Sequence, residues 1–390
     1  MKTSVAIIDF GTSKIVGLIA EISNRQRCDI AGAGIATYDG YLEGACNAPE
    51  ALDEAIQKAV REAENQAHQR IREVYVGVPA AFSKVMTVET RLALQGADPK
   101  VTGRDVRAIL DQAVQELGAV KGKIIHRSPA WFKVDEGKKT MEPTGVRGVE
   151  LKALISFVIA DDFFLSDVTE RFKALGIDVN GFFSTPAGEA MLFVSGEERD
   201  RKAVLVDIGY LNTEVMTLEG DALTSLKAIP IGGGNIAADL AYGLNIPLAS
   251  AESIKRAYIY NLTTGQKEFE TTGKDGNTLT FSRDEVERVL LPRAEEICEK
   301  IKQAIEDSGV VFGNWSAVYL TGGGMAINRG GREYVGAKLN MTVREIPRKT
   351  VKMSSPAYSS TLGLLDLAVD TVQGDDSVQG IGGFFRSLFG

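Results

Sequence analysis

The sequence predicts an α/β protein with two like halves that face one cleft. Two segments support this prediction because they are nearly the same: VAIIDFGTSK at residues 5–14 and AVLVDIGYLNTE at residues 203–214. Each is an apolar, β-branched run typical of a buried strand, and each ends in Asp, one residue and Gly before a polar turn. A third apolar run, in AVYLTGGGMAIN at residues 317–328, leads into three glycines. Together these segments favour a duplicated fold.

The two repeated turns carry residue types that suit the phosphates of a nucleotide. A carboxylate at the end of a central strand, as at Asp9 and Asp207, can orient the water molecules of a Mg²⁺ ion. A glycine two residues later lets backbone N–H groups approach phosphate oxygens. A single Asp-x-Gly often does no more than end a strand. The prediction of a phosphate site therefore depends on the pair.

Length and composition narrow the class of protein. A chain of 390 residues exceeds what one hydrophobic core usually serves, so at least two domains are expected. Its net charge of −8 argues against a general nucleic-acid binder, which needs a basic face. The three cysteines, Cys28, Cys46 and Cys298, have neither metal-ligand spacing nor the even count of a disulfide framework. Since His68 and His126 are the only histidines, a zinc site or a His-based hydrolase is not expected.

The first half of the chain reads as strands followed by a long helix. After the first hairpin, the pattern predicts strands at residues 15–21 and 29–36, a helix at 49–69 and a strand at 71–78. No apolar run is long enough to span a bilayer, and the first residues lead directly into a strand, which favours a cytoplasmic protein.

The pattern of predicted elements changes between residues 81 and 160, which indicates an inserted module. Here we predict strands at 84–90 and 149–159 on either side of a polar helix at 103–117, together with the stretch IIHRSPAWFKVD from residue 124. A helix at 161–175 then resumes the first pattern.

The second half begins with the same kinds of elements as the first. A strand pair at 203–218 precedes a glycine-led helix after residue 231, and the pattern then predicts a helix at 247–260, an exposed hairpin at 263–277 and a long helix at 283–307. The stretch TVQGDDSVQG, from residue 371, has the composition of a flexible linker, and residues 381–390 become apolar again.

In this order the segments resemble the actin, Hsp70 and sugar-kinase ATPase superfamily, and within it the FtsA family of bacterial cell division. Five stretches carry the first resemblance: two phosphate hairpins at 9–14 and 207–214, two connecting segments at 184–190 and 362–365, and an adenosine loop at 322–324. Three stretches carry the second: 231–258, which is similar to the opening of the family's subdomain 2B, 124–160, which looks like its subdomain 1C, and 383–390, which looks like its membrane-targeting tail.

The resemblance implies an actin-like duplicated ATPase fold, with two lobes around a nucleotide cleft and an inserted 1C-type α+β subdomain. It divides the chain into subdomain 1A at residues 1–81, 161–198 and 351–370, subdomain 1C at 82–160, subdomain 2A at 199–240 and 308–350, subdomain 2B at 241–307, a linker at 371–380 and a tail at 381–390.

The resemblance also implies ATP and Mg²⁺ as ligands. Asp9 and Asp207 would face the waters of Mg²⁺, and a Glu-x-x-Lys-Arg helix would hold the ribose and adenine. The full predicted nucleotide site is Asp9, Gly11, Thr12, Ser13, Lys14, Asp207, Gly209, Asn212, Thr213, Gly233, Glu252, Lys255, Arg256, Gly322, Gly323 and Gly324.

Two departures from the family pattern argue for slow or absent hydrolysis. The second hairpin has Tyr210 and Leu211 where relatives have glycines, so any positive-φ positions there are expected to be strained. Thr185 stands before Pro186 where relatives place an acid or an amide, and a threonine cannot act as a general base at neutral pH.

The tail predicts a membrane contact. Phe384, Phe385, Leu388 and Phe389 fall on one side of a helix with Arg386 on the other, which suits a helix lying in a membrane surface. The alternatives are a tail packed on the protein's own core and a disordered tail. Burial of these residues is roughly offset by ordering costs, so weak binding by one chain, strengthened by polymerisation, is expected.

By resemblance, the partners are the C-terminal peptide of the tubulin-like protein FtsZ, further copies of the chain and membrane lipid, at the cytoplasmic face of the division septum. Arg283, Arg288 and Arg293 are the candidate residues for the acidic FtsZ peptide. Two other readings stay open: an active ATPase or kinase of the same superfamily, and an actin-like pilus-assembly protein.

Overall fold

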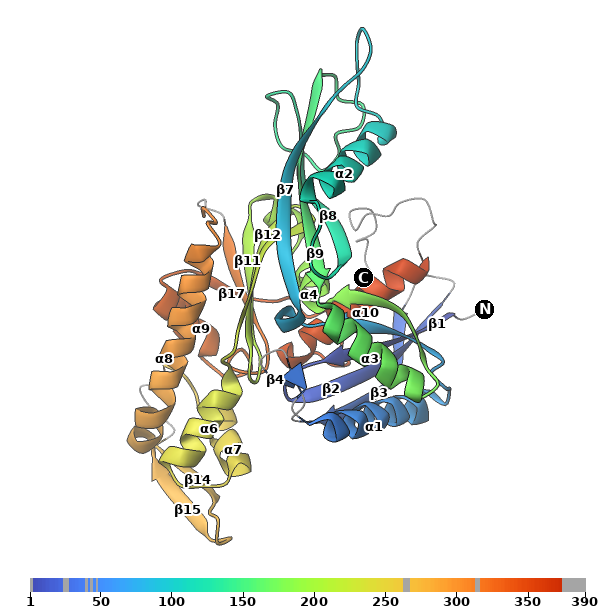
Figure 1. Ribbon diagram of the computed structural model, residues 1–390. Coiled ribbons are helices and arrows are strands. Elements are labelled where there is room, and N and C mark those ends of the chain that lie inside the picture. Colours follow the sequence, from blue (N-terminus) through green and yellow to red (C-terminus); the bar gives the residue numbers. More distant parts are fainter. Residues whose placement is uncertain are drawn as a thin grey trace.

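The computed structural model shows two five-stranded sheets with the same topology (Figure 1). It describes residues 3–23, 28–38, 41–42, 45–46, 48–261, 267–312 and 316–373. The first sheet has the order β3 (Cys28–Thr37), β2 (Lys14–Ile22), β1 (Thr3–Phe10), β6 (Glu73–Val78), β10 (Asp178–Ser184). The second has the order β13 (Ala222–Ile229), β12 (Thr213–Glu219), β11 (Ala203–Ile208), β16 (Ala317–Thr321), β17 (Val343–Glu345).

Strand directions match between the two sheets as well. In each sheet the first three strands of the order are antiparallel, and the last two run parallel to the central strand. The central strands β1 and β11 are those of the repeated sequence. The duplication predicted from two short segments therefore extends to whole sheets.

Helices cover the outer face of each sheet. Helices α1 (Pro49–Ala67) and α3 (Asp162–Ala174) pack on one face of the first sheet, and we call this body lobe I. Helices α6 (Gly233–Gly243), α7 (Leu248–Ala257), α8 (Arg283–Asp307) and α9 (Gly331–Leu339) pack on the second sheet with the hairpin β14 (Glu268–Thr272) and β15 (Thr278–Ser282), and we call this body lobe II.

The inner faces of the two sheets meet around a pair of helices. Helix α10 (Ser359–Gln373) covers the inner face of the first sheet, and α4 (Thr185–Phe193) packs on the inner face of the second. The two helices touch at Gly188 and Gly363, where a Cβ on Gly363 would lie 2.2 Å from the Glu189 backbone nitrogen. Only glycine allows this approach, which brings the ends of β1 and β11 toward one another.

The third body is the predicted insert, which projects from the lobes at the top of Figure 1. Its sheet has the order β7 (Ser83–Ala93), β9 (Glu150–Ala160), β8 (Lys123–Val134), and α2 (Gly103–Leu117) packs on it. Helix α2 begins at a capping box in which Thr102 and Asp105 satisfy each other's backbone N–H groups. The remaining short elements are β4 (Tyr41–Leu42), β5 (Ala45–Cys46), η1 (Ala80–Phe82), α5 (Gly196–Asp200) and η2 (Pro356–Tyr358).

Most predicted elements are confirmed, and three differ. The stretch IIHRSPAWFKVD is a strand, β8, whose two register shifts break the period of two. The exposed hairpin lies at 268–282, later than predicted, because Gly273 and Gly276 form its turn. Helix α10 continues to Gln373, so the first three residues of the predicted linker are helical.

No helix among the described residues is long and apolar enough to cross a membrane. The predicted tail residues Phe384, Phe385, Arg386, Leu388 and Phe389 lie outside the described part of the chain.

Candidate functional site

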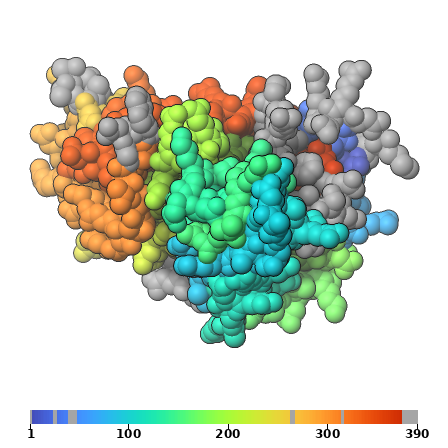
Figure 2. All heavy atoms as spheres, turned by 90° about the horizontal axis from the view of Figure 1, so that it is seen from above, coloured from blue at the N-terminus to red at the C-terminus, as the bar shows by residue number. Residues whose placement is uncertain are grey.

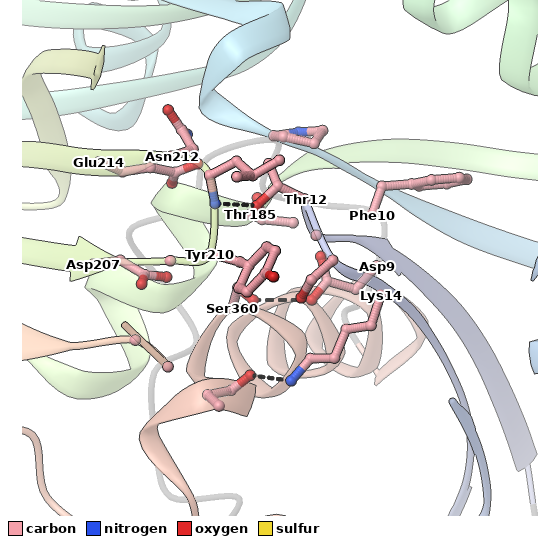
Figure 3. Close-up of a pocket in the computed structure, with 18 of the residues that line it drawn as sticks. Asp9, Phe10, Thr12, Lys14, Thr185, Asp207, Tyr210, Asn212, Glu214 and Ser360 are labelled. Carbon is pink, nitrogen blue, oxygen red and sulfur yellow. Dashed lines mark hydrogen bonds between the residues drawn. The ribbon is translucent and has the colours of Figure 1, made fainter. Parts of the chain in front are cut away.

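The two repeated segments form matching turns on opposite sides of one cavity. Gly11 donates its backbone N–H to the Lys14 carbonyl at 3.0 Å, and Gly209 donates to the Asn212 carbonyl at 2.8 Å. A Cβ on either glycine would lie within 3.1 Å of the accepting oxygen, so both turns require the small residue. The strands before the turns end with Asp9 and Asp207, which bring their carboxyl groups to the two sides of the cavity (Figure 3).

The cavity has a volume of about 630 Å³, within the range of small-molecule and cofactor sites. Both lobes line it, and twelve of the sixteen predicted nucleotide-site residues are on its wall: Asp9, Gly11, Thr12, Ser13, Lys14, Asp207, Gly209, Asn212, Glu252, Arg256, Gly322 and Gly323.

The other four predicted residues lie behind that wall and support it. Thr213 donates its hydroxyl to the Ile231 carbonyl at 2.7 Å, and Gly324 donates its N–H to the Ile208 carbonyl at 2.6 Å. The side chain of Lys255 is only 1% exposed, donates to the Gly233 carbonyl at 3.1 Å and pairs with Glu252 at 2.7 Å. Lys255 thus fixes the Glu252 side chain and does not itself line the cavity.

Acidic groups are concentrated on the wall of this cavity, around the ends of β1 and β11. Asp9 accepts hydrogen bonds from Ser360 at 2.9 Å and Thr361 at 2.6 Å, yet burial raises its pKa. Burial, and then the charge of Asp9, raise the pKa of Asp207 to about 7. Burial and the charge of Asp207 raise the pKa of Glu214 to about 8. The carboxylate forms of these groups therefore lack compensation in the protein alone.

A fourth carboxyl, Glu189 on α4, is fully buried next to this group. Neither of its oxygens makes a hydrogen bond of good geometry to another described residue, and burial followed by the charge of Asp207 raises its pKa well above the ordinary value, although the nearby Ser359 hydroxyl opposes this shift. Lys14 is the nearby cation, but its ammonium donates to the Ala357 carbonyl at 2.9 Å and lies 3.9 Å from the Tyr358 ring centre. Burial lowers the pKa of Lys14 as well.

These residues fit a hydrated divalent cation. The Oδ1 atom of Asp207 is buried and has no hydrogen-bond partner among the described residues, and a Cβ on Gly322 would lie 2.1 Å from it, so the loop after β16 packs directly on this carboxyl group. Over the described ranges, no group of three or more His, Cys, Asp or Glu residues could hold a metal ion by direct ligation. Asp9 and Asp207 suit contact with Mg²⁺ through its waters, because Mg²⁺ commonly keeps several waters and is held by one or two carboxylates.

The second hairpin is not strained, which corrects the expectation drawn from Tyr210 and Leu211. Neither residue has a positive φ angle, so the turn accommodates both side chains without a conformational cost. The Tyr210 ring points into the cavity between the two lobes (Figure 3). The Leu211 N–H donates to the Thr12 hydroxyl at 3.0 Å across the cleft.

Several residues of the cavity were missed by the sequence reading. Glu214 lies at the end of the repeated segment, and its Oε1 atom accepts from the Ala80 N–H of lobe I at 3.4 Å, so its position in the repeat was an available signal. Ala357 lies in η2 and Ser360 in the first turn of α10, and neither was predicted because their contacts with β2 and β1 span more than 340 residues.

Comparison with known proteins finds sequence similarity to one family. The family model for cell division protein FtsA matches residues 204–363. Cell division protein FtsA of Pseudomonas aeruginosa is 25% identical over 92% of this chain and 87% of its own length. FtsA of Bacillus subtilis is 24% identical over 93% of this chain and 82% of its own length. The chain is similar to these FtsA proteins over more than nine-tenths of its length.

Solved structures support the actin-like fold of this FtsA relative. The PilM-PilN type IV pilus biogenesis complex matches with a TM-score of 0.61 at 16% identity, over 94% of this chain and 98% of that one. MreB5 of Spiroplasma citri bound to ADP matches with a TM-score of 0.52 at 13% identity, over 95% and 99%. The MamK double helical filament matches with a TM-score of 0.51 at 14% identity, over 94% and 98%. At sequence identities of 13–16%, these matches show a shared fold and do not by themselves show a shared function.

The three arginines considered for the FtsZ peptide differ in their surroundings. Arg283 pairs with Glu287 at 2.7 Å and lies 4.7 Å from the Tyr258 ring centre, and Arg293 pairs with Asp239 at 2.6 Å. Arg288 is exposed and has no hydrogen bond or ion pair to another described residue. Of the three, Arg288 is the one available to an acidic ligand.

The raised pKa values predict a stability that falls as pH rises. A carboxyl whose folded pKa lies above its unfolded value keeps its proton longest in the folded state, so its contribution is complete below pH about 4 and is lost as pH rises through about 7 to 8. We expect the free energy of unfolding, measured by urea titration without ligand, to be lower at pH 8.5 than at pH 6.

The double variant Asp207→Asn with Glu214→Gln should reduce the slope of the free energy of unfolding against pH. It should not remove it, since burial also raises the pKa of Asp366 to about 6 and, with the charge of Asp366, that of Asp370 to about 7. Asp111→Asn, at an exposed carboxyl on α2, is the control and should leave the slope unchanged. An equal slope in the double variant would contradict the assignment.

Proposed function

We propose that this FtsA relative binds Mg²⁺ and ATP between lobes I and II. The observation that supports the proposal best is the pair of matching turns, with Asp9 and Asp207 at corresponding positions and one cavity of about 630 Å³ between them. Asp207 lines this cavity and its Oδ1 has no partner among the described residues, so a hydrated cation beside the carboxyl group would compensate its charge. The fold is shared with an MreB5 solved in complex with ADP.

Within this proposal, each side of the cavity has its own task. Gly11 and Thr12 on one side, and Gly209 and Asn212 on the other, would hold phosphate oxygens. The Glu252 carboxylate would accept from ribose hydroxyls, because Lys255 and Arg256 hold it at 2.7 and 2.8 Å. Arg256 has a side chain that is 61% exposed and could stack on the base from the open side.

We further propose that the chain is an actin-like scaffold of cell division, which polymerises and tethers FtsZ filaments to the cytoplasmic face of the membrane at the septum. Its curated relatives are cell division proteins, and its fold is shared with a protein solved as a double helical filament. The exposed Arg288 on α8 is the candidate contact for the acidic FtsZ peptide. The amphipathic residues Phe384, Phe385, Arg386, Leu388 and Phe389 would supply the membrane contact.

A role in pilus assembly is the second candidate, since the PilM-PilN complex has the same fold with a TM-score of 0.61. The sequence relatives favour cell division over this alternative. Binding of FtsZ distinguishes the two.

For the nucleotide site, we expect Asp9→Ala to weaken Mg-ATP binding by at least about 10–100-fold, because the ion's waters lose an acceptor. Isothermal titration calorimetry measures the affinity. Asp29→Ala, an exposed carboxylate on β3, is the matched control and should bind like the parent. Unchanged affinity in Asp9→Ala, with an intact thermal transition, would contradict the site.

For hydrolysis, we expect steady-state phosphate release well below about 1 s⁻¹, the low end of ordinary enzyme turnover, under polymerising conditions on lipid. The Leu211 N–H is held by Thr12, and Thr185 cannot activate water, so one donor to the transferring phosphoryl group is occupied and the position before Pro186 supplies no base. Tyr210→Gly with Leu211→Gly should raise the rate. No gain in affinity or rate would mean that this turn does not limit the reaction.

For the membrane role, we expect Phe384→Glu to abolish co-sedimentation with anionic liposomes without changing the thermal transition, because a charge opposes burial of the apolar side. Ser387→Glu, on the polar side, is the control. Purified FtsZ should sediment with liposomes only when the parent chain is present. Loss of the thermal transition in Phe384→Glu would show instead that the tail packs on the body.

A further inference from the structure

The start of helix α4 forms part of the cleft wall and is held from outside lobe I. Thr185, the first residue of α4, lines the cavity, and Ser184 before it caps the helix. The backbone N–H of Ser184 donates to Nε2 of His126 at 2.8 Å, in a fully buried contact. His126 belongs to β8 of the insert and stacks on Phe183 with ring centres 5.8 Å apart. One side chain of the insert therefore contacts the residue next to the cleft wall.

A register shift aims His126 at this position. Ile124 pairs with Ile159 and His126 pairs with Val158, so Ile125 is an extra residue in β8. Such bulges redirect the side chains that follow them. The next residue, Arg127, bonds Asp111 on α2 at 3.1 Å. Burial lowers the pKa of His126 to about 4, so the ring is neutral at physiological pH and its Nε2 can accept a hydrogen bond.

The same insert is also fixed to lobe II. Ser156 on β9 donates its hydroxyl to the Leu223 carbonyl of β13 at 2.5 Å, and Lys139 pairs with Glu219 at 2.5 Å. At the turn after β12, Gly220 has φ +57°, and a Cβ there would lie 2.0 Å from the Ala130 carbonyl oxygen. Figure 2 shows the insert, in cyan to green, directly against the yellow-green atoms of this region. The insert is thus joined to lobe I by the chain and to lobe II by packing.

We propose that His126 is a positioning residue that couples the insert to the nucleotide cleft. The coupling rests on the proposed nucleotide site. Ligand between the lobes fixes their separation, so it fixes β13 of lobe II relative to Ser184, the last residue of β10 in the sheet of lobe I, and the insert sheet that contacts both must follow. Such a coupling is reciprocal. If nucleotide changes the affinity of the insert for a ligand that shifts β8, that ligand changes the affinity for nucleotide by the same factor.

A purely structural role for His126 predicts something different. In that case the imidazole only satisfies a buried N–H, and its loss would destabilise α4 whether or not nucleotide is present. Coupling requires in addition that nucleotide protects the insert through this contact. Hydrogen exchange separates the two, because it reports opening segment by segment.

The test is hydrogen exchange of the full chain with and without Mg-ATP, in four proteins. His126→Phe keeps a ring of similar size and removes the acceptor, whereas His126→Gln offers an amide oxygen to Ser184. Arg127→Gln breaks the adjacent contact to α2 and is the matched control. His126→Leu is the second acceptor-free variant if the Phe variant lacks a thermal transition.

In the parent chain, we expect Mg-ATP to slow exchange by about tenfold both in the turns at 9–14 and 207–214 and in β8 and β9. In His126→Phe the turns stay protected and the insert does not, while His126→Gln and Arg127→Gln behave like the parent. Protection of the turns without the insert in the parent, or an equally protected insert in His126→Phe, would overturn the coupling.

Failure of the proposed nucleotide site looks different, since Mg-ATP would then leave the turns unprotected in the parent. The ligand-free samples decide the positioning role in that event. Without nucleotide, His126→Phe should speed exchange at residues 184–187 by about tenfold or more, and Arg127→Gln should not. Unchanged exchange at these residues in His126→Phe would overturn the assignment of His126.

Discussion

Burial of several carboxyl groups around one cavity is the constraint on which the site depends. Asp9, Asp207 and Glu214 line the cavity, Glu189 lies behind it, and the pKa of each is raised by burial. The one ammonium group among the lining residues, that of Lys14, is held by the Ala357 carbonyl. Such an arrangement costs folding free energy unless a cation compensates it. A hydrated divalent ion with a nucleotide's phosphates would supply that compensation and hold the two lobes together.

The duplicated topology produces this constraint. In both sheets the central strand ends with Asp at the inner edge, and α4 and α10 pack between the sheets with a glycine contact at Gly188 and Gly363. The close helix crossing brings the two strand ends to one cavity. The same helix pair carries Thr185 and Ser360 into the wall. Packing of the apolar inner faces and assembly of the polar site are therefore consequences of one geometry.

The sequence predicted the parts of the structure that are local or repeated. The strands with their Asp-x-Gly turns, the polar helix α2 and the long helix α8 were predicted from their sequence patterns, and all are present. Sequence could not predict contacts between distant segments. Ser360 reaches Asp9 across 351 residues, and nothing in its neighbourhood indicates that contact. The bulge in β8 hid that strand because it interrupts the period of two, and it is the same bulge that aims His126 at α4.

Tyr210 and Leu211 show a second limit of sequence reasoning. Relatives have glycines at these two positions, which suggested positive φ angles, yet neither Tyr210 nor Leu211 has one. The consequence of the substitution is chemical, because the Leu211 N–H is used across the cleft by Thr12. A missing glycine thus changed the hydrogen bonding of the turn and left its backbone relaxed.

Proton release on binding tests the central claim most directly. If Mg²⁺ compensates the buried carboxyls, binding favours their ionised forms, and protons held by Asp207 and Glu214 near neutral pH must leave. Calorimetry with preformed Mg-ATP at pH 7.5, in two buffers of different ionisation enthalpy, measures the number of protons released on binding. The account predicts release of between about a half and one proton for each nucleotide bound. Equal enthalpies in the two buffers, or proton uptake, would contradict it.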